Sequence, residues 1–280
     1  MSAPAPLGLI AGGGDLPRRI AEAVTAKGRP VHVIAVAGFA RAADFKVSRA
    51  IELRIGQAGR ALEWLHEGKV REVVLAGHVR RPSLMTLIPD AGSISIIARI
   101  GRAAFQGDDS LLQAAIRVLR EEGIGVIGAQ DLLTDLLQKP GLLAGTPPDA
   151  VARDDIARGI AVATALGSVD VGQSVVVQQG LVLGVEGIEG TDALVARCGD
   201  LRREGPGGVL VKLVKPGQSR LVDLPTIGPR TIEGVAASGL RGVAFEAGGT
   251  ILIERAETIA AAEAAGLFLL AFDAANPNQE

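Results

Sequence analysis

The chain contains few aromatic residues and no extended basic surface. Aromatic residues make up 2% of its 280 residues, and tyrosine is absent. Proteins that bind single-stranded nucleic acid stack the bases on aromatic side chains. A net charge of −2 also provides no general attraction for a polyanion. We therefore expect no nucleic-acid partner.

Cysteine and metal-binding histidine patterns are equally scarce. Cys198 is the single cysteine, which excludes an intrachain disulfide and a cysteine-rich metal site. The three histidines lack the spacing of zinc ligands. No apolar run has the length of a transmembrane helix. A secretory signal has basic residues before its apolar run, and here no basic residue precedes the first apolar run. We expect a cytoplasmic protein.

Apolar residues are abundant, at 48%, so the chain can form substantial cores. In its first half, short apolar runs alternate with amphipathic stretches. Strands are expected at residues 7–11, 31–36, 72–76 and 124–128, and helices at 16–27, 57–67 and 109–122. This alternation predicts a parallel sheet with right-handed crossovers. We expect a Rossmann-like domain over residues 1–137.

The second half begins after a segment rich in glycine and proline. Residues 138–149 (QKPGLLAGTPPD) are therefore predicted as a linker. Further strand-like and helix-like segments follow over residues 150–280, which we interpret as a second α/β domain with a mixed sheet. The fold class is thus α/β with two domains, and we expect the ligand cleft between them.

Glycines follow the first expected strand and precede the first helix. Gly12, Gly13 and Gly14 either cradle a phosphate with their amides or form a tight turn into the helix. The loop lacks the GxGxxG pattern, and no acidic residue ends the second strand, so NAD binding is weakly supported. Gly77, His78 and Arg80 follow the third expected strand at the same sheet edge. They either grip a phosphate or form a solvated turn.

Carboxylates crowd the segment from Glu186 to Asp192. They would repel one another unless neutralised, and a hard cation such as Mg²⁺ accounts for the crowding. A helix dipole alone could instead neutralise Asp192. Lys212 and Lys215 follow at the end of a strand, and alternation places at most one of them in a site. Asp223 lies in a proline-bounded turn, where it either binds a metal or water or merely caps turn amides.

Five segments, taken in order, resemble one family along nearly the whole chain. They are GLIAGGGDLP (8–17), GHVRRP (77–82), GDDSLL (107–112), QSVVVQQGLVLGVEGIEGTD (173–192) and VKLVKPGQSRLVDLPTIGPRT (211–231). The chain resembles UDP-2,3-diacylglucosamine pyrophosphatases of the LpxI type. The resemblance implies hydrolysis of UDP-2,3-diacylglucosamine to UMP and 2,3-diacylglucosamine 1-phosphate (lipid X) in lipid A biosynthesis. It also implies a divalent metal, typically Mg²⁺, and an essential aspartate that falls on Asp223.

The resulting hypothesis assigns residues to three roles. We expect Asp223 and Lys215 to be catalytic, and Asp223, Glu189 and Asp192 to hold the metal. Substrate-binding residues are expected to be Gly12, Gly13, Gly14, Gly77, His78, Arg80, Gln173, Gln178, Gly190, Thr191, Lys212 and Thr226. The apolar segment Ser83–Phe105 either packs in a core or contacts acyl chains. Peripheral contact with the inner membrane is compatible with such a substrate, and a homodimer is the default assembly. The alternatives are an NAD(P)-dependent oxidoreductase and a non-catalytic sensor of a nucleotide-sugar or lipid.

Overall fold

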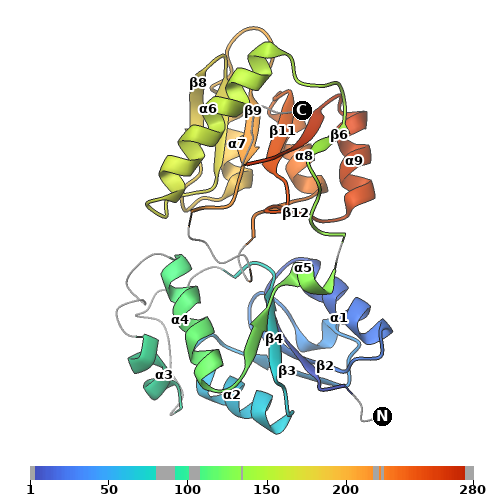
Figure 1. Ribbon diagram of the computed structural model, residues 1–280, viewed down its shortest axis with the longest axis vertical. Helices are drawn as coiled ribbons and strands as arrows, with labels where there is room; N and C mark the ends of the chain where they lie inside the picture. The colour runs from blue at the N-terminus through green and yellow to red at the C-terminus, as the bar shows by residue number, and fades with distance from the viewer. Residues whose placement is uncertain are drawn as a thin grey trace. The chain divides into compact units, whose positions relative to one another are not determined.

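The computed structural model divides the chain into two compact units (Figure 1). It describes residues 4–79, 92–100, 108–133, 135–216, 221 and 224–274. The first unit is made mainly of Met1–Thr134, and the second of Asp135–Gln218 and Leu224–Glu280. Within the residues described, no helix is both long and apolar enough to cross a membrane.

The first unit is built on a five-stranded parallel sheet, as predicted. Its strand order is β3-β2-β1-β4-β5. The strands are β1 (Leu7–Ala11), β2 (Val31–Val36), β3 (Arg49–Leu53), β4 (Glu72–Ala76) and β5 (Gly125–Ile127). The helices are α1 (Leu16–Ala26), η1 (Ala42–Asp44), α2 (Ala58–Glu67), α3 (Ser93–Ile100), α4 (Asp108–Glu121) and α5 (Ala129–Leu132). Strand β3 was not predicted, because its alternation of polar and apolar residues at a sheet edge produces no apolar run.

The core of this unit lies between the sheet and helices α2 and α4. Leu65 and Ile116 project from these helices, and Ile34, Val73 and Val126 project from the sheet. Helix α1 packs against strands β1 and β2. Parallel strands that are covered in this way are nearly continuous in apolar residues, which is why β1, β2 and β4 could be predicted.

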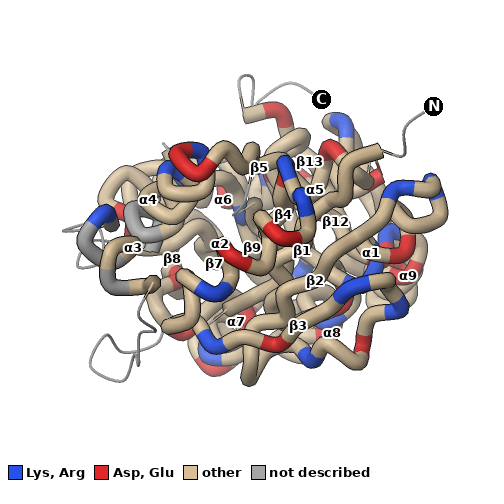
Figure 2. Tube along the Cα trace, turned by 90° about the horizontal axis from the view of Figure 1, so that it is seen from below, with Lys and Arg blue, Asp and Glu red and all other residues tan. Residues whose placement is uncertain are grey.

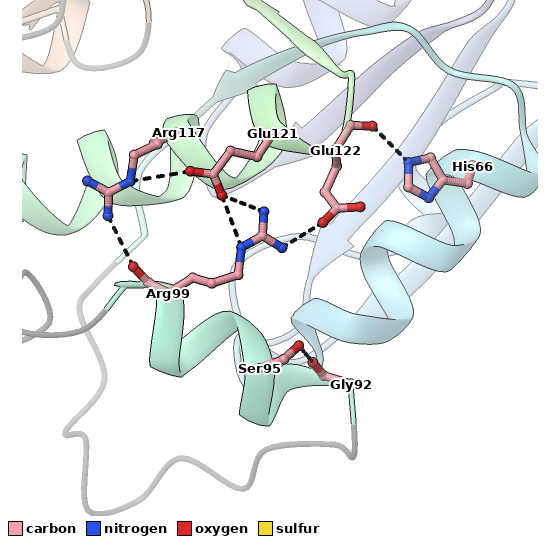
Figure 3. A network of polar contacts seen from close by, with 7 residues as sticks. All are labelled: His66, Gly92, Ser95, Arg99, Arg117, Glu121 and Glu122. Carbon is pink, nitrogen blue, oxygen red and sulfur yellow. Dashed lines mark hydrogen bonds and ion pairs between the residues drawn. The ribbon is translucent and has the colours of Figure 1, made fainter.

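Helix α3 is attached to α4 by a network of charges (Figure 3). The Arg99 guanidinium donates to Glu122 Oε1 at 2.6 Å and to Glu121 Oε2 at 2.6 Å. Arg117 donates to the Arg99 carbonyl at 3.1 Å. Helix α3 belongs to the apolar segment Ser83–Phe105, whose remaining residues lie mostly outside the described ones. Its suggested contact with acyl chains therefore stays a prediction.

The second unit contains a six-stranded mixed sheet, also as predicted. Its order is β6-β13-β11-β9-β7-β8, in which β9, β11 and β13 are parallel, and β6 and β7 run antiparallel to their neighbours. The strands are β6 (Gly141–Ala144), β7 (Ser174–Gln178), β8 (Leu181–Val185), β9 (Val209–Lys212), β11 (Gly242–Glu246) and β13 (Phe268–Phe272). Strands β10 (Thr226–Ile227) and β12 (Ile251–Leu252) form a separate parallel pair.

Strand alternation gives the second sheet two buried faces. Val175 and Val211 pack with Ile156 of helix α6 (Ala150–Gly167) on one face. Val176 and Leu210 pack with three helices on the other face. These helices are α7 (Thr191–Gly199), α8 (Pro229–Ala237) and α9 (Arg255–Ala264) (Figure 1).

The segment predicted as a linker contributes a strand to this sheet. Within residues 138–149, strand β6 pairs antiparallel with β13. Glycine and proline at both ends of this short edge strand produced the linker prediction, although its middle, Leu142–Leu143, is apolar. Edge strands tolerate such residues, since one side of their backbone needs no partner.

Charged residues of both signs are distributed over both units. Figure 2 shows Lys and Arg interspersed with Asp and Glu along the described trace. This mixture matches the small net charge of −2.

Candidate functional site

A buried lysine marks the candidate site in the second unit. Lys212 is the last residue of β9, and it is 5% exposed. Its ammonium donates to Thr191 Oγ1 at 2.8 Å and to the Thr226 carbonyl at 3.1 Å. Parallel α/β sheets bind ligands beyond the carboxyl ends of their strands, and Lys212 occupies such an end.

The hydroxyl of Thr191 links Lys212 to a buried carboxylate. Thr191 begins helix α7, and its hydroxyl donates to Glu186 Oε1 at 2.7 Å. Ser174 Oγ lies 3.4 Å from the same hydroxyl. The backbone amide of Gln173 donates to Glu186 Oε2 at 3.4 Å. We call Gln173, Ser174, Glu186, Thr191, Lys212 and Thr226 the Lys212 cluster.

Strand pairing explains why these residues meet. Strand β7 runs antiparallel to β9, so Ser174 at the start of β7 lies opposite Lys212 at the end of β9. Strand β8 returns from β7, which brings Glu186 beside Ser174, whose carbonyl accepts from the Glu186 amide at 2.8 Å. The cluster contains four predicted residues: Gln173, Thr191, Lys212 and Thr226. Ser174 and Glu186 were not assigned as site residues, although Glu186 belongs to the segment of crowded carboxylates that the sequence singled out.

The Lys212 cluster has features of a site for a polar anion. Helix α7 begins after Gly190, which adopts a φ of +82° and provides no capping side chain. The first amides of a helix attract anions. Gln173 Oε1 is buried and has no hydrogen-bond partner among the residues that the structure describes. Buried carbonyl oxygens normally have a donor, so a ligand hydroxyl or amide would fit beside a phosphate.

Glu189 and Asp192, predicted as metal ligands, each have an arginine partner instead. Glu189 forms an ion pair with Arg197 at 2.9 Å, and Asp192 one with Arg230 at 3.5 Å. Hydrogen bonds from its own backbone amide and from Arg197 lower the pKa of Glu189. Across the described parts of the chain, no three His, Cys, Asp or Glu side chains are grouped closely enough to hold a metal between them. The role of Glu189 and Asp192 as metal ligands stays a prediction.

The sequence did not indicate these arginine partners, because the fold brings them to the carboxylates from later in the chain. Arg197 is on the last turn of α7, and Arg230 is on α8. A run of carboxylates in the sequence does not reveal cations that the fold brings to it. Asp223, the third predicted ligand and the predicted catalytic residue, lies outside the described residues. It precedes Thr226 of the Lys212 cluster by three positions.

Lys215, predicted as catalytic, forms an ion pair with Asp170. The two charged atoms are 2.5 Å apart, and the lysine side chain is largely buried. Asp170 adopts a φ of +56° in the loop between α6 and β7. A non-glycine residue in this region is strained unless its surroundings hold it, and the ion pair supplies one such contact.

Gln178, predicted to bind substrate, serves the opposite end of β7. Its side-chain amide donates to the carbonyls of Arg203 and Pro206, at 3.0 and 2.8 Å. Its oxygen accepts from the Arg203 amide at 2.9 Å. Gln178 is fully buried, so its role is to hold the loop before β9. It does not belong to the Lys212 cluster.

In the glycine loop of the first unit, two backbone amides bond to backbone carbonyls of the same unit. Gly12 donates to the Ala76 carbonyl at 2.8 Å, and Gly13 donates to the His78 carbonyl at 2.8 Å. The hypothesis that these two amides hold a phosphate is therefore wrong for this structure. A Cβ atom on Gly13 would lie 2.6 Å from the His78 ring, so the glycine permits close packing.

The neighbouring residues complete this turn. Gly77 has a φ of +88°, and a Cβ atom there would lie 2.6 Å from the Gly13 carbonyl oxygen. Gly14 also has a positive φ, of +93°, with more open surroundings. Arg80 lies outside the described residues, and its role in phosphate binding stays a prediction. Of the two interpretations of this loop, the close-packed turn is the one observed.

Comparison with known proteins covers both units. Residues 6–136 match the LpxI N-terminal domain, and residues 139–270 match the LpxI C-terminal domain. UDP-2,3-diacylglucosamine pyrophosphatase LpxI of Caulobacter vibrioides is 38% identical over 275 residues, spanning 95% of this chain and 97% of that protein. The chain therefore belongs to the LpxI family.

Proposed function

We propose that the protein hydrolyses the pyrophosphate bond of UDP-2,3-diacylglucosamine, a reaction of lipid A biosynthesis. Water adds to one phosphorus, the P–O–P bond breaks, and UMP and 2,3-diacylglucosamine 1-phosphate are released. The carrying observation is the 38% identity, over nearly the full length of both proteins, to a pyrophosphatase named for this substrate.

The Lys212 cluster supports this proposal by its chemistry. Cleavage of a pyrophosphate requires neutralisation of phosphate charge and an oriented water, with little covalent chemistry by the protein. Lys212 supplies a buried positive charge beside a helix N-terminus. We assign it, with the first backbone amides of α7, to one phosphate of the substrate. Gln173 Oε1 is suited to a hydroxyl or amide of the sugar or nucleoside.

We also propose that a divalent cation such as Mg²⁺ takes part, with Asp223 as its protein ligand. Mg²⁺ is often held by one or two carboxylates together with substrate phosphates and water. Such a site requires no cluster of three acidic side chains. When bound, the cation would neutralise phosphate charge. Support for Asp223 comes from the family resemblance of the segment around it.

The test of this proposal is UMP release by the wild-type protein and by Asp223→Ala. Removing a positioned acid–base group or metal ligand lowers the rate by about 10²–10⁴-fold, so we expect at least a hundredfold lower kcat. Thermal unfolding of both proteins controls for folding. A variant as active as the wild type would remove Asp223 from the mechanism. Hydrolysis in ¹⁸O-labelled water then identifies the attacked phosphorus, since the labelled product carries it.

The two rival functions have less support. Gly12 and Gly13, the best candidates for a dinucleotide loop, direct their amides to backbone carbonyls. A thermal shift with 2,3-diacylglucosamine 1-phosphate and none with NAD(P) would exclude the oxidoreductase. Binding of the lipid without UMP release, at saturating substrate and Mg²⁺, would instead favour a sensor.

The lipid substrate suggests where the protein works. We propose peripheral contact with the cytoplasmic face of the inner membrane, where a diacylated sugar would be presented. Flotation with vesicles of anionic and zwitterionic lipid tests this contact, and a protein that stays entirely in the aqueous fraction would contradict it. A homodimer remains the default expectation for assembly.

A further inference from the structure

We propose that Glu186 is a positioning residue for substrate binding, which acts on Lys212 through the Thr191 hydroxyl. This inference rests on the proposed function, in which Lys212 binds a substrate phosphate. It adds a buried carboxylate that does not itself contact the substrate but determines how the lysine is held.

The direction of the hydrogen bonds carries the inference. A carboxylate only accepts, so the single Thr191 proton is donated to Glu186 Oε1, at 2.7 Å. The Thr191 oxygen then presents its lone pairs to Lys212, whose ammonium donates to it at 2.8 Å. The order Lys212→Thr191→Glu186 is thereby fixed. If position 186 could donate, the hydroxyl could turn its proton toward the lysine and lose this bond.

Burial strengthens the coupling. Glu186 is 7% exposed and Lys212 is 5% exposed. Buried charges are stable only when they are paired or hydrogen-bonded, and one hydroxyl connects these two. The carboxylate therefore contributes both a geometric restraint and a compensating negative charge. Both effects reach the substrate only through Lys212.

A purely structural role is the rival explanation. Glu186 Oε2 also accepts a hydrogen bond from the backbone amide of Gln173 at 3.4 Å, which helps to join the ends of β7 and β8. If this were the whole role of Glu186, its loss would lower stability without a specific effect on Lys212. An experiment must therefore separate folding from coupling.

A double-mutant cycle in kcat/KM for UMP release makes this separation. We expect Glu186→Gln to lower kcat/KM about tenfold or more, as for a lost hydrogen bond to a charged group. In a Lys212→Met background, the same change should lower it less than about twofold, because the residue through which it acts is gone. Thr191→Val should reproduce the Glu186→Gln loss, and Thr191→Ser, which keeps the hydroxyl, should restore most of the activity.

Asp155→Asn provides the matched control. Asp155 on α6 is 1% exposed, and its carboxylate accepts the Gln179 and Gly180 amides of the β7–β8 turn, at 3.0 and 2.6 Å. It thus holds the same hairpin at the end away from the cluster. We expect this variant to lower the melting temperature and to leave kcat/KM per folded molecule unchanged.

Each outcome of the cycle decides the proposal. An equal loss from Glu186→Gln in both backgrounds, or no loss in either, would overturn the coupling to Lys212 while leaving the proposed hydrolysis intact. If Glu186→Gln does not fold, the Thr191→Val and Thr191→Ser pair decides, and equal activities of these two would overturn the inference. Absence of UMP release by the wild-type protein would overturn the proposed function and this inference with it.

Discussion

Burial controls the chemistry of the single cysteine. Cys198 lies on the inner face of α7 and is 0% exposed. Desolvation by burial raises the pKa of its thiol. Since only the thiolate reacts with disulfide reagents, we predict that native protein at pH 8 is labelled by 5,5′-dithiobis(2-nitrobenzoate) far more slowly than denatured protein. The absorbance of the released thiolate measures the rate, and Cys198→Ala provides the blank.

The raised pKa of Cys198 also determines how this thiol makes folding stability depend on pH. Because folding raises it, the neutral thiol is favoured in the native state. The contribution of the neutral thiol to the free energy of unfolding is fully present below the unfolded pKa of about 8.5. It is lost as the pH rises through the higher native pKa. Labelling of native protein at the rate of a free thiol would contradict the burial of Cys198.

At the scale of elements, Arg99 joins helix α3 to the end of α4 by two ion pairs. Arg99 pairs with Glu121 and Glu122, and hydrogen bonds to Glu122 and then Glu121 raise its pKa (Figure 3). We predict that Arg99→Ala accelerates amide hydrogen exchange in Ser93–Ile100 while leaving strands β1 and β4 protected, because local openings follow local contacts. Mass spectrometry of peptic fragments provides the measurement.

Arg117→Ala is the matched control for this prediction. Arg117 pairs with Glu121 of its own helix at 3.9 Å and donates one hydrogen bond to the Arg99 carbonyl of α3 at 3.1 Å. Its loss removes one hydrogen bond to α3, whereas Arg99→Ala removes two ion pairs, so the Arg117 variant should change exchange in α3 less than Arg99→Ala. Equal exchange in all three proteins would show that the ion pairs of Arg99 do not determine the attachment of α3.

The elements also show what could be predicted from sequence. Buried strands such as β1, β2 and β4 were predicted with their observed bounds, since continuous apolar runs are typical of covered parallel sheets. Edge strands β3 and β6 were missed, because an exposed edge imposes neither an apolar run nor the absence of glycine. Prediction therefore succeeded for strands that show an apolar run, including the edge strand β5, and failed for the edge strands β3 and β6.

In the candidate site, too, some features could be predicted from the sequence and others could not. Lys212 was predicted because strand ends in an α/β fold collect functional groups, and Thr226 lies in a segment that carries the family resemblance. The link from Glu186 to Lys212 depends on the antiparallel register of β7 against β9, which no local pattern specifies. Likewise, only the fold brings Arg230 to Asp192. Residue types at element ends were predictable, whereas their partners were not.

At the scale of the whole molecule, each unit has its own core. The two clusters of buried apolar residues in the second unit are drawn entirely from Ala144 to Phe272, and include Leu210, Phe245 and Leu269. The cluster of the first unit lies between Ile34 and Val126. A core that is complete within one segment is the property that allows a domain to fold alone.

We therefore predict that a fragment of residues 135–280 folds by itself. It should unfold in one cooperative transition, because strands β7, β9 and β11 and their covering helices α6 and α7 are all retained. Slow labelling of Cys198 in the isolated fragment provides an independent measure, since the thiol is protected only if α7 packs on the sheet.

As a control, residues 150–280 lack β6, which pairs with β13 at the sheet edge. That shorter fragment should melt at a lower temperature. Labelling of residues 135–280 at the rate of the denatured chain would show that the second unit requires the first in order to fold.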